Sequence, residues 1–174
     1  MTEQKQETKP LSRSEREAQI KDRAGFVIVV LAALLAINTM IGGQNSSKTM
    51  NNTIAANNQW AWYQAKNMRQ VLYETAAVES KIPENRAKFE AEAARMKVDK
   101  EEIMAKAKAL EDERDVARQK SPWFTWGGSV LQIGIVLLTA SILAVSMPMF
   151  WVSVVVGSVG AVLVSQALWM WMPL

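Results

Sequence analysis

The stretch AGFVIVVLAALLAINTMI, residues 24–41, is 18 residues long and contains no charged side chain. As an α-helix it would extend roughly 27 Å, which is close to the thickness of the hydrocarbon core of a bilayer. We therefore interpret it as a first transmembrane helix, preceded by a charged and partly helical tail over residues 1–23. The alternative is a cleaved signal peptide, but a charged region of 23 residues is long for one, and no clear small-residue cleavage site follows.

Residues 121–174 form a second neutral tract, without a single Asp, Glu, Lys or Arg. A helix of these 54 residues would extend roughly 80 Å, which is enough for two crossings of a bilayer. Pro148 marks the break, because proline interrupts a helix and restricts the residue before it. The sequence predicts a second transmembrane helix over residues 126–146 and a third over residues 149–172.

The predicted spans contain the carboxamide side chains of Asn38, Gln132 and Gln166. Because successive spans cross the membrane in alternating directions, all three are expected at a similar depth. A carboxamide without a partner in hydrocarbon is costly, so one hypothesis is an interhelical hydrogen-bond cluster. In the alternative interpretation, each side chain reaches lipid headgroups or the backbone of its own helix.

The third predicted span carries small residues at a spacing of four, namely Ser153, Gly157, Ala161 and Ser165. Such a stripe allows another helix to approach closely, and that helix could belong to the same chain or to another. None of the three spans contains a charged residue, and ion and proton pathways usually need one. The pattern therefore argues for helix packing and against a pump or transporter.

The charged middle of the chain, residues 42–122, is expected outside the membrane. It begins with GGQNSSKTMNN (42–52), whose glycines and small polar residues favour a turn. Two helical patterns follow, at about residues 50–80 and 84–120, with Pro83 between them. The predicted fold class is an all-α membrane protein with three transmembrane helices and an extramembrane antiparallel helical hairpin, or coiled coil, between the first and the second.

The first pattern, residues 50–80, has apolar residues on one face, among them Ile54, Met68 and Leu72, and we expect this face to be the packed one. Aromatic and cationic residues occupy the opposite, otherwise polar face: Trp62, Lys66, Arg69 and Tyr73. They are candidates for contact with a partner protein or with lipid headgroups. The alternatives are an interfacial helix, or packing against another part of this chain.

The second pattern, residues 84–120, repeats every seven residues, and its seam consists of Phe89, Met96, Ile103 and Leu110. Positions four further on alternate between alanine and a cation, so the coiled-coil seam is imperfect. The sequence DKEE (99–102) could form a capping box that splits this helix. The unbroken heptad phase favours one continuous helix instead.

Composition excludes several kinds of site. The chain has no Cys and no His, which removes thiol nucleophiles, the commonest zinc ligands and any Ser-His-Asp arrangement. The spacing of the carboxylates predicts no metal site, and no glycine-rich phosphate loop is present. A net charge of +3 is too small to indicate nucleic acid. We expect no catalytic residue, no cofactor and no metal.

Three segments together resemble a known family. They are the sequence NNQWAWYQAKNMRQ, which includes Trp60, Tyr63 and Lys66, then residues 101–117, then residues 131–144. This combination is similar to the domain of unknown function 4337 family. The resemblance implies a bacterial membrane protein and brings no known activity. Family members often have basic residues in the turn between the last two spans, where this chain has SMPM.

Basic residues flank the first span mainly on its amino side, at Arg13, Arg16, Lys21 and Arg23. The positive-inside rule then favours a cytoplasmic amino terminus and a periplasmic hairpin in a bacterial inner membrane. Arg118 and Lys120, which precede the second span, argue for the opposite orientation. We expect a non-enzymatic accessory or scaffolding subunit, bound to the lipid bilayer, that forms a homo-oligomer or joins a larger membrane complex. The alternatives are a small oligomeric channel and, with no supporting residues, a lipid-modifying enzyme.

Overall fold

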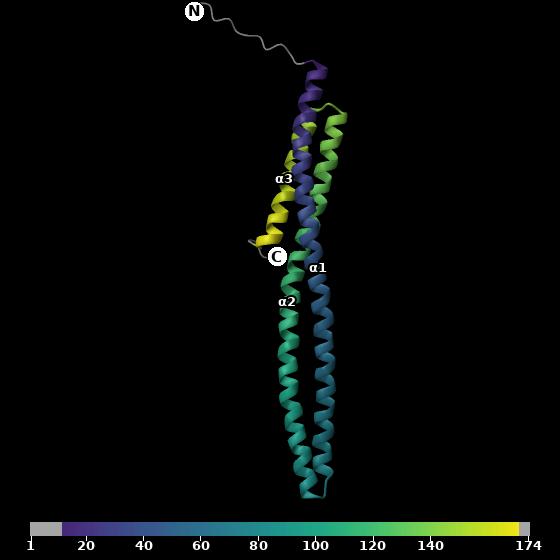
Figure 1. Cartoon of the computed structure of the whole chain (residues 1–174), viewed down its shortest axis with the longest axis vertical. Helices are drawn as coiled ribbons and strands as arrows, with labels where there is room; N and C mark the ends of the chain where they lie inside the picture. Colours follow the sequence, from purple (N-terminus) through teal and green to yellow (C-terminus); the bar gives the residue numbers. More distant parts are fainter. Residues whose placement is uncertain (1–11, 171–174) are drawn as a thin grey trace, which may run out of the picture. The chain divides into compact units, whose positions relative to one another are not determined.

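A computed structural model describes residues 12–170, and within this range the protein contains three α-helices and no strand. Helix α1 spans Arg13–Glu79, α2 spans Pro83–Leu143 and α3 spans Met147–Trp169 (Figure 1). Each contains a window long and apolar enough to cross a membrane. The described chain forms two compact units, which we call the three-helix unit (12–43 with 120–170) and the two-helix unit (44–119).

Helix α1 has no turn at residues 42–52, so the predicted turn there is wrong. Gly42 serves packing, because a Cβ added to it would lie 3.2 Å from the Cβ of Phe124. Two threonines bond their hydroxyls within the helix. Thr49 donates its hydroxyl to the carbonyl of Asn45 at 3.0 Å, and Thr53 does the same to Thr49 at 2.7 Å. Residues that favour turns therefore stand in a continuous helix here.

Helix α2 is also continuous, through both Asp99 and Pro122, so the sequence 99–102 does not split it. The chain reverses after Leu143, where Val145 adopts a positive φ of 48°. Pro148 then lies in the first turn of α3, where a proline sacrifices no helical hydrogen bond. The proline thus begins the third helix, while the residues just before it make the turn.

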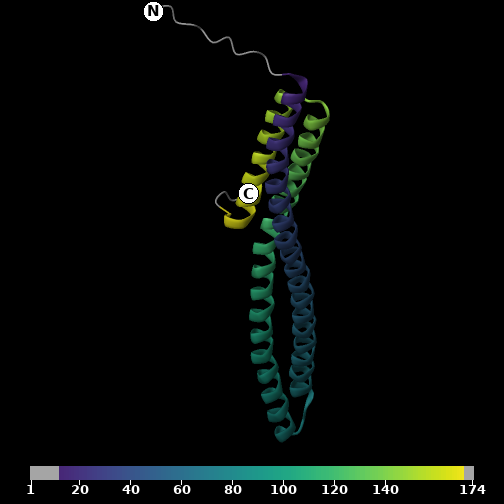
Figure 2. The same cartoon turned by 45° about the horizontal axis from the view of Figure 1, so that its top comes forward.

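The three-helix unit is held together by close helix contacts. Figures 1 and 2 both show the carboxyl-terminal part of α2 and all of α3 side by side with the first part of α1. Its buried apolar core consists of Ala24, Leu31, Leu131, Leu138, Phe150 and Val164. Glycines set the spacing between α2 and α3, because a Cβ on Gly134 would lie only 3.0 Å from the Cα of Gly157. Such contacts need residues without side chains on both helices.

The two-helix unit pairs residues 44–79 of α1 with residues 83–119 of α2. Asn45 donates its side-chain amide to the carbonyl of Ala117 at 2.7 Å. Further along α1, the Lys66 ammonium lies 2.6 Å from the Asp99 carboxylate. Residue numbers therefore rise along α1 as they fall along α2. Between the two helices, polar side chains therefore contact one another alongside a few buried alanines and Met96.

Candidate functional site

The three predicted polar residues of the spans do not share one environment. Asn38 is buried and donates its amide to the carbonyl of Phe124 at 3.0 Å, while its Oδ1 has no hydrogen-bond partner. Gln166 is also buried, with 1% of its surface exposed. Gln132, in contrast, lies on an exposed face of α2. Within a single chain the structure therefore buries two of the three carboxamides and leaves Gln132 exposed, and a cluster of all three stays a prediction.

The predicted stripe of small residues on α3 is buried for part of its length. Ser153 and Gly157 are buried, and a Cβ on Gly157 would lie 2.6 Å from Cδ1 of Leu31, on α1. Ala161 and Ser165 are only half-buried. Gly160 also belongs to the contact surface but was not part of the predicted stripe. A Cβ there would lie 2.9 Å from the backbone nitrogen of Leu131. The contact surface thus runs along 153, 157, 160 and 164, alternating steps of four and three, as helix packing requires.

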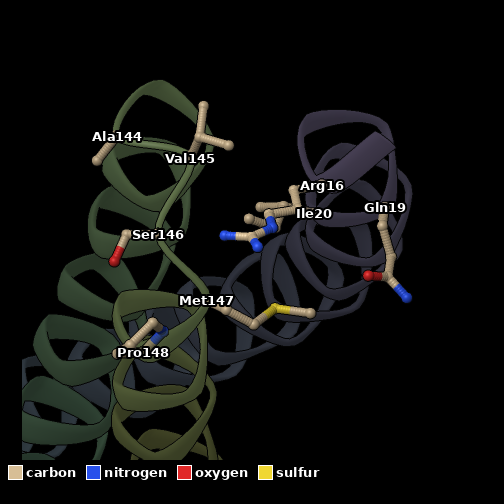
Figure 3. A pocket seen from close by; sticks show the side chains of 8 residues that line it. All are labelled: Arg16, Gln19, Ile20, Ala144, Val145, Ser146, Met147 and Pro148. Atoms are coloured by element: carbon tan, nitrogen blue, oxygen red, sulfur yellow. The ribbon is translucent and has the colours of Figure 1, made fainter. Parts of the chain in front are cut away.

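A pocket of about 600 Å³ lies between the start of α1 and the turn that joins α2 to α3 (Figure 3). Arg16 and Ile20 line it from α1, and residues 144–148 line it from the turn. In Figure 3 the guanidinium of Arg16 points from α1 towards the turn, and the side chain of Met147 extends from the turn towards α1. The turn itself carries no charge. Arg16 therefore supplies a cation at the end of the unit where the SMPM turn has none.

The seam of the two-helix unit is largely polar. Besides Lys66 and Asp99, Lys100 donates to Oδ1 of Asn67 at 2.9 Å. Trp60 donates its indole N–H to a Glu111 carboxylate oxygen at 3.1 Å. The signal that could have revealed this seam is a polar heptad on α1, which an analysis of apolar periodicity ignores.

Electrostatics in this seam favours the ionised carboxylates. The hydrogen bond from Lys66 lowers the pKa of Asp99 from its ordinary value of 3.8, against an opposing effect of desolvation. Hydrogen bonds from Lys48 and then Asn52 lower the pKa of Glu113 from 4.5. Both carboxylates receive a cation and hold it across the helix pair. A lowered carboxyl pKa fits a structural ion pair and does not fit a general acid, which needs a raised one.

The four predicted contact residues of α1 differ in their surroundings, and their contact with a partner or with lipid stays a prediction. Lys66 lies in the seam with Asp99, and Tyr73 also faces the seam, where its ring stacks on Phe89 with centroids 6.3 Å apart. Trp62 and Arg69 are exposed. Helical spacing alone placed these four together. The cross-helix contacts separate them, because the seam follows a heptad that passes through positions 66 and 73.

On α2, the residues of the predicted coiled-coil seam are buried to different degrees. Met96 is buried, whereas Phe89, Ile103 and Leu110 are half-buried. Alanines at 93, 107 and 117 are the other buried positions of this helix within the unit. Short side chains on α2 leave room for the long polar side chains of α1. This explains how a polar seam fits between closely paired helices.

The apolar stripe of α1, which we expected to be packed, faces outward instead. Ile54 is 54% exposed, Met68 73% and Leu72 66%. The outer face of α1 is therefore apolar and the inner face polar, the reverse of the usual amphipathic arrangement. This reversal is the strongest feature of the two-helix unit.

In residues 12–170, no three His, Cys, Asp or Glu side chains come together in a way that could hold a metal ion.

The described fold is that of an all-helical protein with three helices compatible with membrane spans. A family model described as "Domain of unknown function (DUF4337)" matches residues 20–170, nearly the whole chain. The protein therefore belongs to this family, which confirms the resemblance noted from its aromatic and charged segments. Neither the curated proteins nor the solved structures contain a match to the chain.

Proposed function

We propose that the protein is a non-enzymatic integral membrane protein that acts as a scaffolding or accessory subunit. Its three-helix unit lies in the bilayer, and its two-helix unit is an extramembrane helical hairpin that assembles with other chains. The observation that carries this proposal is the outward apolar stripe of α1, because an apolar helix face in water needs a partner. No substrate or cofactor is required for this role.

Exposed side chains support membrane insertion of the three-helix unit. Phe26, Val29 and Val136 are between 65% and 73% exposed, on helices that carry no charge over these stretches. Burying such side chains in lipid is favourable by about 1.5–3 kcal/mol each relative to water. The polar groups of the backbone are already paired within helices, as a bilayer requires.

Charge distribution supports an amino terminus in the cytoplasm of a bacterium and a hairpin in the periplasm. Arg13, Arg16, Lys21 and Arg23 precede the first neutral stretch. The α2–α3 turn, which lacks charge, has the guanidinium of Arg16 beside it (Figure 3). The same end of the three-helix unit therefore gains its positive charge from α1, which satisfies the positive-inside rule without basic residues in the turn.

Cysteine labelling tests both insertion and orientation, since the natural chain contains no cysteine. We expect Lys81→Cys to react with a membrane-impermeant maleimide in intact spheroplasts, and Ala18→Cys to react only after the membrane is opened. Both variants should remain in the membrane fraction after an alkaline wash. Release of the intact chain into the soluble fraction would refute insertion, and the reverse labelling pattern would refute the orientation.

A second candidate is a small oligomeric channel, and the exposed Gln132 on α2 is the observation that favours it. A carboxamide on the outer face of a membrane helix is stabilised when it bonds to another chain or lines a wet path. The channel predicts solute flux in liposomes that is lost in Gln132→Leu. The scaffold predicts no flux and a stable complex in mild detergent.

A further inference from the structure

Helix α1 of the two-helix unit has two opposite faces, and within residues 12–170 only one of them is covered by another helix. The inner face recurs at alternating steps of four and three, and its members are buried or half-buried: Asn45, Thr49, Asn52, Ala56, Gln59, Tyr63, Lys66, Gln70, Tyr73 and Ala77. The outer face, which we call the outer stripe, is exposed throughout: Ile54, Asn58, Ala61, Ala65, Met68 and Leu72. Each outer position lies two residues, or about 200° around the helix, from an inner one.

The outer stripe has the spacing of a coiled-coil seam. Its steps are four, three, four, three and four residues, which is the alternation of a heptad repeat. With this phase, Asn58, Ala65 and Leu72 occupy a positions, and Ile54, Ala61 and Met68 occupy d positions. A helix with a free heptad seam is prepared for another helix of the same kind. A bare apolar patch has no such regular register.

Charge distinguishes this face from the rest of the unit. Residues 83–119 of α2 contain 19 charged side chains, which keep that helix soluble on its outside. Residues 44–79 of α1 contain five, and none of them belongs to the outer stripe. The stripe is therefore neutral as well as apolar, and two copies of it would meet without repulsion.

We propose that the outer stripe docks on the outer stripe of a second copy of this chain, forming a parallel, in-register coiled-coil dimer. This inference rests on the proposed membrane insertion, because two copies that cross the bilayer in the same sense present α1 in the same direction. A two-fold axis then brings each stripe residue against itself in the other copy. The result is a bundle in which α1 of each chain is covered on both faces.

Two details of the stripe favour a second copy over an unrelated partner. Asn58 occupies an a position, and a paired asparagine there fixes the register and selects a dimer. Arg69 occupies the flanking e position, opposite Gln64 at the g position of the other copy, so a guanidinium meets a neutral amide. No like charges face each other in this arrangement. The residues of the stripe can therefore pair with the same stripe of the second copy, as an isologous interface requires.

The exposed area is sufficient for a stable dimer. Six large side chains on or beside the stripe are between 52% and 73% exposed: Met50, Ile54, Trp62, Met68, Val71 and Leu72. Together they offer roughly 800 Å² per copy, which is about what one partner contributes to a standard protein interface. Trp62, at a flanking e position, is the natural anchor, because tryptophans supply much of the binding energy at interfaces.

Cysteine cross-linking of the full chain in its native membrane tests the proposal. Single variants Ala61→Cys, Met68→Cys and Leu72→Cys are treated with an oxidant, and Asn67→Cys is the matched control, exposed on the same helix one residue away. We expect the three stripe variants to shift from the mass of one chain to that of two, and Asn67→Cys to remain at one. In a parallel, in-register dimer the stripe cysteines meet their own copies.

Each other result overturns the dimer. Equal cross-linking at Asn67 indicates random collision, and cross-linking at one stripe position alone indicates an antiparallel or staggered crossing. Absence of dimers at all three positions refutes the dimer, and adducts to a different protein only show that another partner covers the stripe. In those cases the labelling of Lys81→Cys and its retention in the membrane still decide the proposed membrane insertion independently. Solubility of all variants without detergent would instead refute the membrane role.

Discussion

Replacing Gly160 with alanine tests the packing of α2 on α3. The new Cβ would lie 2.9 Å from both the backbone nitrogen and the Cγ of Leu131. The leucine side chain can rotate, but the backbone nitrogen belongs to a continuous helix and moves only if the two helices separate. Overpacking of this kind costs typically about 1–3 kcal/mol. Alanine has a higher helix propensity than glycine, which offsets up to about 1 kcal/mol of this cost.

We therefore expect Gly160→Ala to lose about 1–2 kcal/mol, a five- to thirtyfold fall in the folded-to-unfolded ratio. The assay is reversible unfolding of the purified protein in mixed micelles, followed by circular dichroism. Gly25→Ala is the matched control, because it lies in a neutral helical stretch of the same unit and a Cβ there would meet nothing within 4 Å. It should be as stable as the natural protein, or slightly more.

A third variant, Gly157→Ala, separates a backbone clash from a side-chain clash. Its Cβ would come closer to a neighbour, 2.6 Å from Cδ1 of Leu31, but that atom is the end of a flexible side chain. The loss should therefore be smaller than in Gly160→Ala, although the distance is shorter. If Gly160→Ala proved as stable as Gly25→Ala, or if Gly157→Ala were the more damaging change, the helix contact described here would be refuted.

Three further changes probe the polar contacts and the outer stripe. The hydrogen bond from Lys66 lowers the pKa of Asp99, so the stability that this ion pair contributes is complete above the ordinary pKa of 3.8 and is lost as the pH falls through the lowered pKa. In thermal melts, acid should therefore lower the melting temperature of the natural protein more than that of Asp99→Asn. Asn38→Leu should change the free energy of unfolding in micelles by less than about 1 kcal/mol, because it removes both the hydrogen bond to Phe124 and the unpartnered Oδ1. A larger loss would show that this Oδ1 has a partner in the membrane. Asn58→Leu should strengthen self-association but yield species larger than a dimer, which light scattering of the protein–detergent complex would measure. An unchanged dimer would show that Asn58 does not lie in the interface.

The absence of charge was enough to predict where the apolar helices lie, but not where the helices end. Residues 42–52 combine glycines with Asn, Ser and Thr, a composition that is typical of turns. In the structure they are helical, the Thr49 hydroxyl bonds back along the helix, and Asn45 bonds to Ala117 on α2. Those partners are distant in sequence or depend on the helix already being formed. Local composition contains neither piece of information.

The face of α1 was mispredicted for a different reason. Apolar periodicity correctly identifies Ile54, Met68 and Leu72 as one stripe, but it cannot say which partner covers that stripe. The usual assumption is that the apolar face meets the neighbouring helix of the same chain. Here Lys66 and Tyr73 meet the neighbour instead, through an ion pair and a ring contact with α2. The sequence contained a second, polar heptad that becomes visible only when its partners on α2 are known.

The polar seam also limits what α2 alone can do for α1. A hydrogen bond between helices contributes a net stabilisation of about 0.5–1.5 kcal/mol, and an ion pair accessible to solvent contributes about 0–1 kcal/mol. Lys66 and Asp99, with side chains 28% and 32% exposed, form an ion pair of this solvent-accessible type. A buried leucine or methionine contributes about 1.5–3 kcal/mol, and on this part of α1 those residues face outward. In the proposed dimer these side chains would be buried only on assembly, so we expect assembly and folding of this segment to be coupled.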